Sequence, residues 1–336
     1  VALVLCAAVA AAQERGLQPD DFYKEVIIQD VAMSPDGSLI AFTRMSIVEK
    51  ENKRHREIWL VEVKDGKPTG EPFRFTSSVH ESSSPQWSPD GKLLCFSSRR
   101  GDDENSVWFA RVTAPGGEAF HIDGVDATPA WSPDGKWIAF TKAPEEEDGD
   151  KKKKREGWIA PDAITNTLDA ERFDGRVLTA MRFKRDGNPN LLPHPSVRKK
   201  SQLFVVPAEG GDAKQITDLP FSVGGIEWAP DSNAITFTGD PLEDDEYNID
   251  YTRNIYVVSI DGGEPAALTG GPGNEMSQVF SPDGQLVAYR FSKERGAETD
   301  ILVDTVNAEG LLSGQPRNLT ADWDLSPGGP EWSPDG

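Results

Sequence analysis

Residue types that perform catalysis or bind metals are few in this chain of 336 residues, and their spacing is unfavourable. The four histidines, His55, His80, His121 and His194, show no paired spacing of the kind that metal sites use. A nucleophilic serine in a Gly-x-Ser-x-Gly elbow stands third in the string, whereas the nearest string, residues 310–314, has Ser313 in fourth place. We therefore predict no catalytic residue, metal site or cofactor within these residues, expect the histidines at surface or turn positions, and leave substrate-binding residues unassigned.

Two acidic runs could in principle attract a cation or an amine. The string at residues 243–246 could bind Ca²⁺, but it lacks the alternating ligand spacing of an EF-hand loop. Glu145, Glu146 and Glu147 begin a run that continues into the basic residues 151–155, a mixture typical of a solvated insertion. The sequence favours solvated loops for both runs.

Charge and composition restrict the possible partners and the fold class. The chain has 35 Lys and Arg against 56 Asp and Glu, so its net charge of −21 would repel nucleic acid or an anionic membrane surface. Its 31 glycines and 25 prolines suit many short strands joined by tight turns. We therefore predict an all-β protein without a nucleic-acid partner.

The N-terminal residues differ from the rest of the chain. Residues 1–12 carry no charge and end in small residues at Ala12, like the end of a signal peptide cleaved before Gln13, although a buried apolar strand is the alternative. The stretch is too short to span a bilayer. We predict a partial signal peptide at 1–12 and an exported protein, periplasmic or extracellular. Once the signal peptide is removed, Cys95 would be the remaining cysteine, which predicts a buried thiol and no intramolecular disulfide.

A five-residue phrase, Trp-Ser-Pro-Asp-Gly, recurs along the chain. It stands at residues 87–91, 131–135 and 332–336, with variants at 33–37, 228–232 and 280–284. Its prolines lie roughly fifty residues apart, except that the interval from Pro133 to Pro230 is about twice as long. We therefore expect a degenerate unit near its middle, at residues 183–187, and seven repeat units with the last one truncated.

Each phrase reads as a hairpin turn between two strands. An apolar residue ends a strand, proline sets the first corner of the turn, aspartate bonds the backbone, and glycine supplies the positive φ. A buried strand follows, with an aromatic residue seven places after the proline and a small residue before it; the pairs are Ala41 and Phe42, Cys95 and Phe96, Ala139 and Phe140, Thr236 and Phe237, and Ala288 and Tyr289. Because a third strand and a fourth one ending in Leu-Thr or Ile-Thr come next in most units, four antiparallel strands recur. This predicts a β-propeller at residues 31–336, after a lead-in at 13–30, with largely buried tryptophans at Trp87, Trp131 and Trp228.

The phrase, the Ala-Phe strand, the later Gly-Gly turn and the Leu-Thr strand resemble the TolB-type, WD40-like propeller repeats. The direct entry at residues 22–31 and the divergent segment at 177–187 resemble the propeller of the prolyl oligopeptidase family, particularly its acylaminoacyl peptidase and dipeptidyl aminopeptidase members. The resemblance covers about residues 17–336. It also allows Glu145, Glu146 and Glu147 to hold a peptide's free amino end, beside the solvated-loop interpretation.

This resemblance carries an expected function. In that family a Ser-Asp-His hydrolase domain of the α/β type follows the propeller, whereas this sequence ends inside its last phrase, at Gly336. The expectation is a non-catalytic propeller for substrate gating and docking, part of an exported serine peptidase that cleaves short peptides. The alternative is a stand-alone TolB-like periplasmic propeller that binds protein partners.

Overall fold

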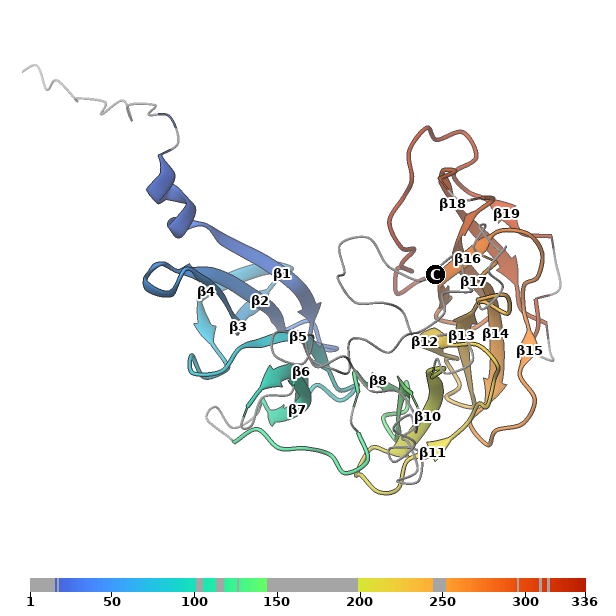
Figure 1. The fold of residues 1–336 in the computed structure, drawn as a ribbon, viewed down its shortest axis with the longest axis horizontal. Helices are drawn as coiled ribbons and strands as arrows, with labels where there is room; N and C mark the ends of the chain where they lie inside the picture. The colour runs from blue at the N-terminus through green and yellow to red at the C-terminus, as the bar shows by residue number, and fades with distance from the viewer. Residues whose placement is uncertain are drawn as a thin grey trace, which may run out of the picture. The chain divides into compact units, whose positions relative to one another are not determined.

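The computed structural model describes residues 16, 18–100, 105–112, 118–125, 127–143, 199–243, 252–294, 296–307, 310–312 and 315–336. The chain divides into two compact units, an N-terminal unit, Val1–Ala119, and a C-terminal unit, Phe120–Gly336. Each unit contains its own antiparallel sheets, built from strands that follow one another in the sequence (Figure 1).

The N-terminal unit contains blades 1 and 2. Blade 1 has the order β1-β2-β3-β4, with β1 (Val26–Met33), β2 (Leu39–Val48), β3 (Lys53–Lys64) and β4 (Lys67–Arg74). The 3-10 helices η1 (Pro19–Lys24) and η2 (Glu49–Glu51) precede β1 and β3. Blade 2 has the order β5-β6-β7, with β5 (Ser82–Trp87), β6 (Leu93–Arg99) and β7 (Asn105–Arg111). Blade 1 therefore begins at Val26, before the start expected at residue 31.

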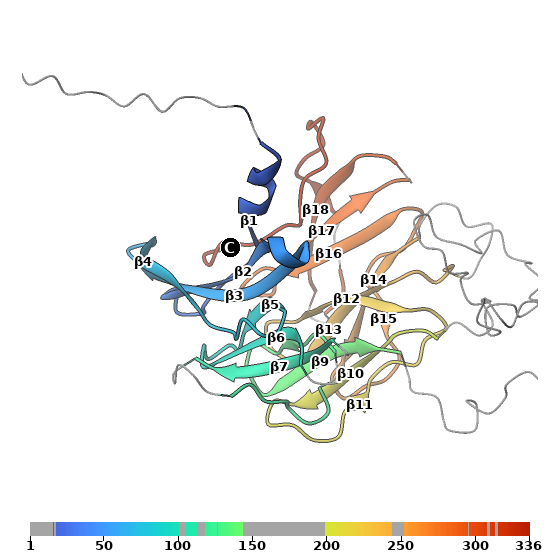
Figure 2. The same ribbon diagram turned by 60° about the vertical axis from the view of Figure 1, so that its left-hand side comes forward.

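The C-terminal unit contains blades 3, 4 and 5 (Figure 2). Blade 3 comprises β8 (Ala130–Trp131), β9 (Trp137–Lys142), β10 (Gln202–Pro207) and β11 (Lys214–Gln215). Blade 4 comprises β12 (Val223–Trp228), β13 (Ala234–Gly239), β14 (Asn254–Ser259) and β15 (Ala266–Ala267). Blade 5 comprises β16 (Asn274–Phe280), β17 (Leu286–Ser292), β18 (Thr299–Thr305) and β19 (Arg317–Asn318). These repeated antiparallel sheets confirm the all-β class and the β-propeller architecture.

Within the described residues, the long interval between Pro133 and Pro230 contains one sheet, blade 3. Strand β10 pairs directly with β9, so that Phe204 lies opposite Phe140. The segment between these strands includes the unit expected at 183–187, and residues 144–198 lie outside the described part of the chain. The described residues form five sheets, and the phrase at 332–336 follows the fifth; the expected total of seven repeat units, which includes the unit at 183–187, stays a prediction. Antiparallel pairing needs no fixed loop length, because lengthening a surface loop costs little closure entropy.

Both faces of the second strands are buried, as predicted. The aromatic residues Phe96, Phe140 and Phe237 are at most 1 % exposed, and so are the small residues on the opposite face, Ala41, Cys95, Ala139 and Thr236. One apolar cluster joins blades 3 and 4, another joins blades 1 and 2, and a smaller one joins blades 4 and 5. Each sheet is therefore packed on its faces as a propeller blade requires.

Every phrase forms the predicted turn, and its serine holds the turn together. The serine hydroxyl donates to the aspartate Oδ1 in four of the described turns, at 2.7 Å in Ser34–Asp36, Ser88–Asp90 and Ser132–Asp134 and at 2.6 Å in Ser281–Asp283. The same serine oxygen accepts the N–H of the residue five places later, at 2.9 Å each time. Blade 4 carries Ala229 in the serine position, and Ser232 takes the positive φ that glycine has elsewhere.

The tryptophan of the phrase joins its blade to the preceding one. Its indole Nε1 donates to the backbone carbonyl of the residue just before the preceding phrase, an interaction that we call the indole clip. The clips run from Trp87 to Ala32 at 3.1 Å, from Trp228 to Ala130 at 2.9 Å and from Trp332 to Val279 at 3.2 Å. Trp228 is buried as predicted, whereas Trp87 and Trp131 are half-buried, although all three lie on the first strands of their sheets.

The two hydrogen bonds of the phrase serine, one to the aspartate and one from the N–H five residues later, are here called the serine bridge. They predict the effect of removing one serine hydroxyl. Ser132→Ala should lower the free energy of unfolding by about 1–2 kcal/mol, because the buried hydroxyl bonds both Asp134 and the Trp137 N–H. The reverse change, Ala229→Ser, supplies this bridge to blade 4 and should not destabilise the protein. Urea unfolding of both variants measures the difference, and equal losses would contradict this role for the serine.

The indole clip predicts a cost for a conservative substitution. Trp228→Phe keeps an aromatic ring but leaves the Ala130 carbonyl without its donor, so unfolding should become easier by roughly 1–3 kcal/mol. Trp137→Phe, which alters a tryptophan packed against the same apolar cluster, is the matched control and should cost less. Denaturant midpoints that fall equally for both variants would show that ring volume, and not the clip, matters.

Candidate functional site

The first strands of the sheets are the best candidates for a binding surface, because they are the edges at which neighbouring blades meet. In the N-terminal unit the Ser84 N–H on β5 donates to Asp30 Oδ2 on β1 at 3.2 Å. In the C-terminal unit Gln278 Nε2 on β16 donates to the Gly225 carbonyl on β12. Blades of a propeller surround a central channel. Strand edges that converge in this way are suited to border it.

Each of these four strands contains a β-bulge at the same place relative to its phrase. The bulged residues lie three places before the phrase, are exposed and have left-handed backbone conformations: Asp30 (φ 49°), Ser84 (56°), Gly225 (54°) and Ser277 (56°). The pairing of each first strand with its second strand shifts register there. Three of the four are not glycine, so the backbone holds an uncommon conformation repeatedly at equivalent positions.

The bulges give the first strands a chemical role that the sequence search missed. A bulge interrupts ladder pairing, so peptide groups there can bond partners outside the ladder, as the Ser84 N–H and the Gly225 carbonyl do. Asp30 adds a carboxylate, while Ser84 and Ser277 add hydroxyls that can donate or accept. The sequence feature that could have indicated these bulges is the small or polar residue three places before each of the four phrases.

Blade 1 carries a separate ion cluster around a buried carboxylate on β3. Glu57 is 6 % exposed, and its oxygens lie 3.4 Å from Arg74 Nη1, 3.7 Å from His55 Nε2 and 3.9 Å from Arg44 Nη1. Trp59 Nε1 donates to Glu57 Oε2 at 3.1 Å, and the Arg44 guanidinium lies 5.1 Å from the centre of the Trp59 ring. Several hydrogen-bonding groups thus offset the cost of burying this charge.

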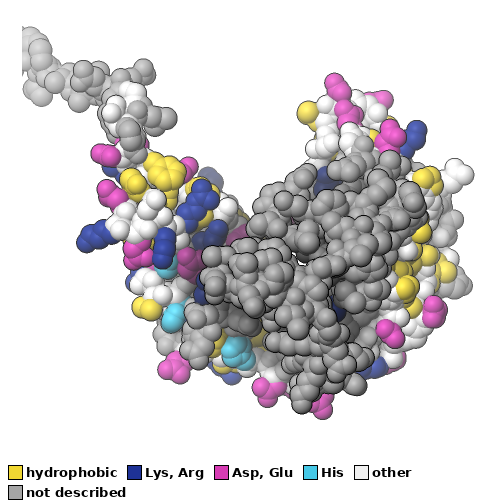
Figure 3. Space-filling view, in the orientation of Figure 1, with side chains coloured by type: hydrophobic (Ala, Val, Ile, Leu, Met, Phe, Trp, Pro, Cys, Tyr) yellow, Lys and Arg dark blue, Asp and Glu magenta, His cyan; other side chains and the backbone are white. Residues whose placement is uncertain are grey.

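Exposed apolar residues lie on β1 of the same sheet, namely Val26, Ile28, Val31 and Met33. Figure 3 shows apolar side chains beside Lys and Arg side chains over the N-terminal strands. The cluster around Glu57 therefore reads as structural support for this sheet and not as a catalytic arrangement.

The remaining sequence candidates do not assemble into a site in the described part of the chain. His55 lies within β3 and not in a turn, His80 is half-buried between β4 and β5, and His121 is exposed. His194, Glu145, Glu146 and Glu147 lie outside the described residues, as do residues 244–246 of the second acidic run. Its first residue, Glu243, forms an ion pair with Lys200. Groups of three or more potential metal ligands are absent from the residues with described positions.

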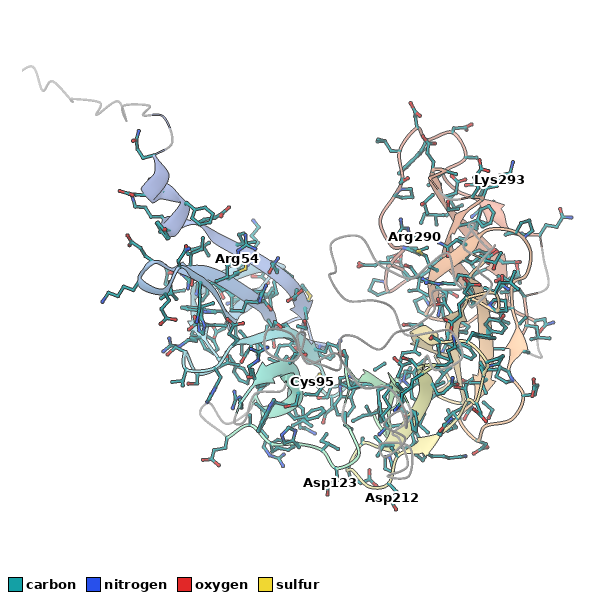
Figure 4. All side chains as sticks on the ribbon, in the orientation of Figure 1. Arg54, Cys95, Asp123, Asp212, Arg290 and Lys293 are labelled. Atoms are coloured by element: carbon teal, nitrogen blue, oxygen red, sulfur yellow. The ribbon has the colours of Figure 1, made fainter. Side chains whose placement is uncertain are left out.

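Figure 4 labels two aspartates on loops, Asp123 and Asp212, and the thiol of Cys95. Asp123 and Asp212 lie on neighbouring loops of the C-terminal unit, where the Gly211 N–H donates to the Asp123 carbonyl at 3.1 Å. Cys95 lies on β6 and is 1 % exposed, as predicted for a core residue. In the described ranges, no helix has the length and apolar character needed to cross a membrane.

Comparison with curated proteins finds peptidases among the relatives. The chain is 24 % identical over 327 residues to dipeptidyl-peptidase 5 of Porphyromonas gingivalis, covering 95 % of this chain and 45 % of that protein. It is 27 % identical over 243 residues to the uncharacterized peptidase YuxL of Bacillus subtilis, covering 71 % of this chain and 33 % of that protein. The chain thus spans less than half the length of these relatives. No family model matches the sequence.

Comparison with solved structures supports the fold. A putative TolB from Agrobacterium tumefaciens matches with a TM-score of 0.53 and 16 % identity, covering 92 % of this chain and 87 % of that one. The acylaminoacyl peptidase of Pyrococcus horikoshii matches with a TM-score of 0.53 and 17 % identity, covering 90 % of this chain and 41 % of that one. These comparisons confirm that the chain resembles TolB-type propellers and the N-terminal propeller of acylaminoacyl peptidase.

Proposed function

We propose that this chain is the non-catalytic propeller of an exported serine peptidase, where it docks the hydrolase domain and limits access to it. The relation that carries the proposal is the match to dipeptidyl-peptidase 5 of Porphyromonas gingivalis, which covers nearly the whole chain but less than half of that protein. The difference in length is expected if the whole protein, like its relative, is longer than this chain and contains a second domain. The hydrolase would supply the Ser-Asp-His residues, and short peptides would be its substrates.

The first strands provide the surface on which such gating would act. Their bulges place exposed small and polar residues at equivalent places in the blades. These groups can bond an extended peptide, whereas a folded protein cannot present single strands to a narrow channel. The propeller would therefore favour short, extended substrates without taking part in the chemistry.

Export is part of the proposal. It is supported by the uncharged residues 1–12 and their small-residue end at Ala12. Mature protein beginning at Gln13 would be periplasmic or extracellular. The N-terminal sequence of secreted protein, expressed from the gene with its start, tests this part independently of the rest.

An activity assay tests the main proposal. The purified 336-residue chain should hydrolyse neither dipeptidyl nor acylaminoacyl fluorogenic substrates, because its sequence has no Gly-x-Ser-x-Gly elbow. Protein expressed from the gene read past the codon for Gly336 should hydrolyse one of these classes, and a serine-directed inhibitor should abolish the activity. The matched control replaces the elbow serine of the longer protein by alanine and should remove turnover while the fold is kept.

The alternative, a TolB-like propeller that binds protein partners, predicts a different result. A reading frame that ends soon after the codon for Gly336 would favour it, supported by the match to the Agrobacterium TolB that covers most of both chains. Turnover by the 336-residue chain that the inhibitor abolishes would overturn both interpretations, since the catalytic residues would then lie within it.

A further inference from the structure

The junction between blades 4 and 5 lacks the indole clip. In the position of Trp87, Trp228 and Trp332, blade 5 carries Phe280, which has no hydrogen-bond donor. The carbonyl that would accept the clip belongs to Glu227, and it accepts the Thr236 hydroxyl of its own blade at 3.2 Å instead. Contacts other than an indole clip must therefore hold blades 4 and 5 together.

A glutamine amide replaces the clip, but only in part. Gln278 Nε2 on β16 donates to the Gly225 carbonyl and lies 3.4 Å from Thr236 Oγ1, so it crosses from blade 5 to blade 4. Gln278 is 3 % exposed, and its Oε1 is buried without a hydrogen-bond partner. A buried acceptor that stays unpaired weakens the contact that carries it.

A buried carboxyl group lies beside this amide. Glu275 on β16 is 7 % exposed, and its Oε2 has no hydrogen-bond partner. Relative to the phrase, blade 4 has Val223 at this position and blade 2 has Ser82. Burial raises the pKa of Glu275 to about 7, against a smaller lowering by a hydrogen bond from Thr269 in blade 4. Near neutral pH, this junction therefore holds an acid that is only partly ionised.

A second carboxyl group faces the junction from blade 4. Glu227 pairs across the strands with Thr236, so both side chains lie on the sheet face that Gln278 contacts. Burial raises the pKa of Glu227 to about 7. The protein thus places one carboxyl group from each blade on the facing surfaces of a single junction.

The other ionisable groups near Glu275 do not neutralise it. Tyr289 on β17 lies on its face of blade 5, because Glu275 pairs with Phe291, two residues from Tyr289. Asp300 and Asp304 on β18 lie on the same face, because they pair with Phe291 and Val287. Burial, together with the charges of Asp304 and Glu275, raises the pKa of Tyr289 to about 12. Arg253 contributes its backbone carbonyl to the Glu275 N–H, and Arg290 lies on the opposite face of β17 (Figure 4). The surroundings of Glu275 are therefore acidic or neutral.

We propose that the junction between blades 4 and 5 is a pH-controlled opening of the propeller, closed when Glu227 and Glu275 are protonated and opened when they ionise. The two groups have higher pKa values in the closed junction than in water, so they stabilise it fully at pH below about 4.5. That stabilisation is lost as the pH rises through about 7. Each carboxyl group should then increase the opening equilibrium by roughly tenfold or more between pH 5 and pH 8.

Hydrogen exchange of backbone amides measures this opening in the complete chain. Once exchange rates are corrected for their intrinsic pH dependence, the amides of β12 and β16 should lose protection by roughly tenfold or more between pH 5 and pH 8. Amides of β6 and β9, far from this junction in the sequence of blades, should not change in parallel. Equal loss of protection in all four strands would indicate global unfolding and overturn the proposal.

Two variants separate the carboxyl groups from the missing clip. Glu275→Gln removes one of the two ionisable groups, so it should reduce the pH dependence of exchange in β12 and β16 to the part that Glu227 contributes. Phe280→Trp supplies the indole donor and should protect both strands at every pH while the slope with pH is kept. Trp228→Phe, the matched control, removes the clip of another junction and should lower protection without adding a slope. A slope unchanged in Glu275→Gln, or a slope steeper in Trp228→Phe than in the unaltered chain, would contradict the proposal.

Discussion

The hydrogen bond from a tryptophan indole to the carbonyl of the preceding blade is the directed contact that fixes how blades pack at the junctions that carry it. Apolar packing between two sheets is non-directional and leaves their relative register open. The indole adds a directed bond between fixed points: the first residue of one phrase and the residue just before the preceding phrase. The position of each phrase in the sequence therefore fixes where its blade contacts the preceding blade.

The turn that follows the tryptophan makes this anchor rigid. Its serine and aspartate bond each other and the backbone, which fixes where the first strand ends. The bonds from Ser88 and the Lys92 N–H lower the pKa of Asp90 to about 2, and those from Lys136 and Ser132 do the same for Asp134. These aspartates stabilise the turns above their unfolded pKa and lose this effect as the pH falls toward 2. The turns are therefore fully formed wherever the carboxyl groups of the blade 4 and 5 junction titrate.

The sequence predicted the parts of the fold that depend on local rules. The turn residues, the alternation around Phe96, Phe140 and Phe237, and the four-strand pattern follow from turn chemistry and period-two burial. It did not reveal that β10 pairs with β9, because this is a contact between distant residues that no local pattern shows. The bulges at Asp30, Ser84 and Ser277 were missed for a related reason, since a positive φ in a residue other than glycine has a weak sequence signal.

The junction between blades 4 and 5 lies where the repeat departs from its own rules. Phe280 replaces a tryptophan, and Glu275 and Gln278 occupy positions that are Val223 and Ile226 in blade 4. Each change lowers the stability of the junction, because it removes a donor or buries a polar atom without a partner. A repeat tolerates such losses at one junction when the neighbouring contacts keep their packing, as the apolar cluster between blades 3 and 4 does. Weakness at one junction would let a propeller open there while its blades stay folded.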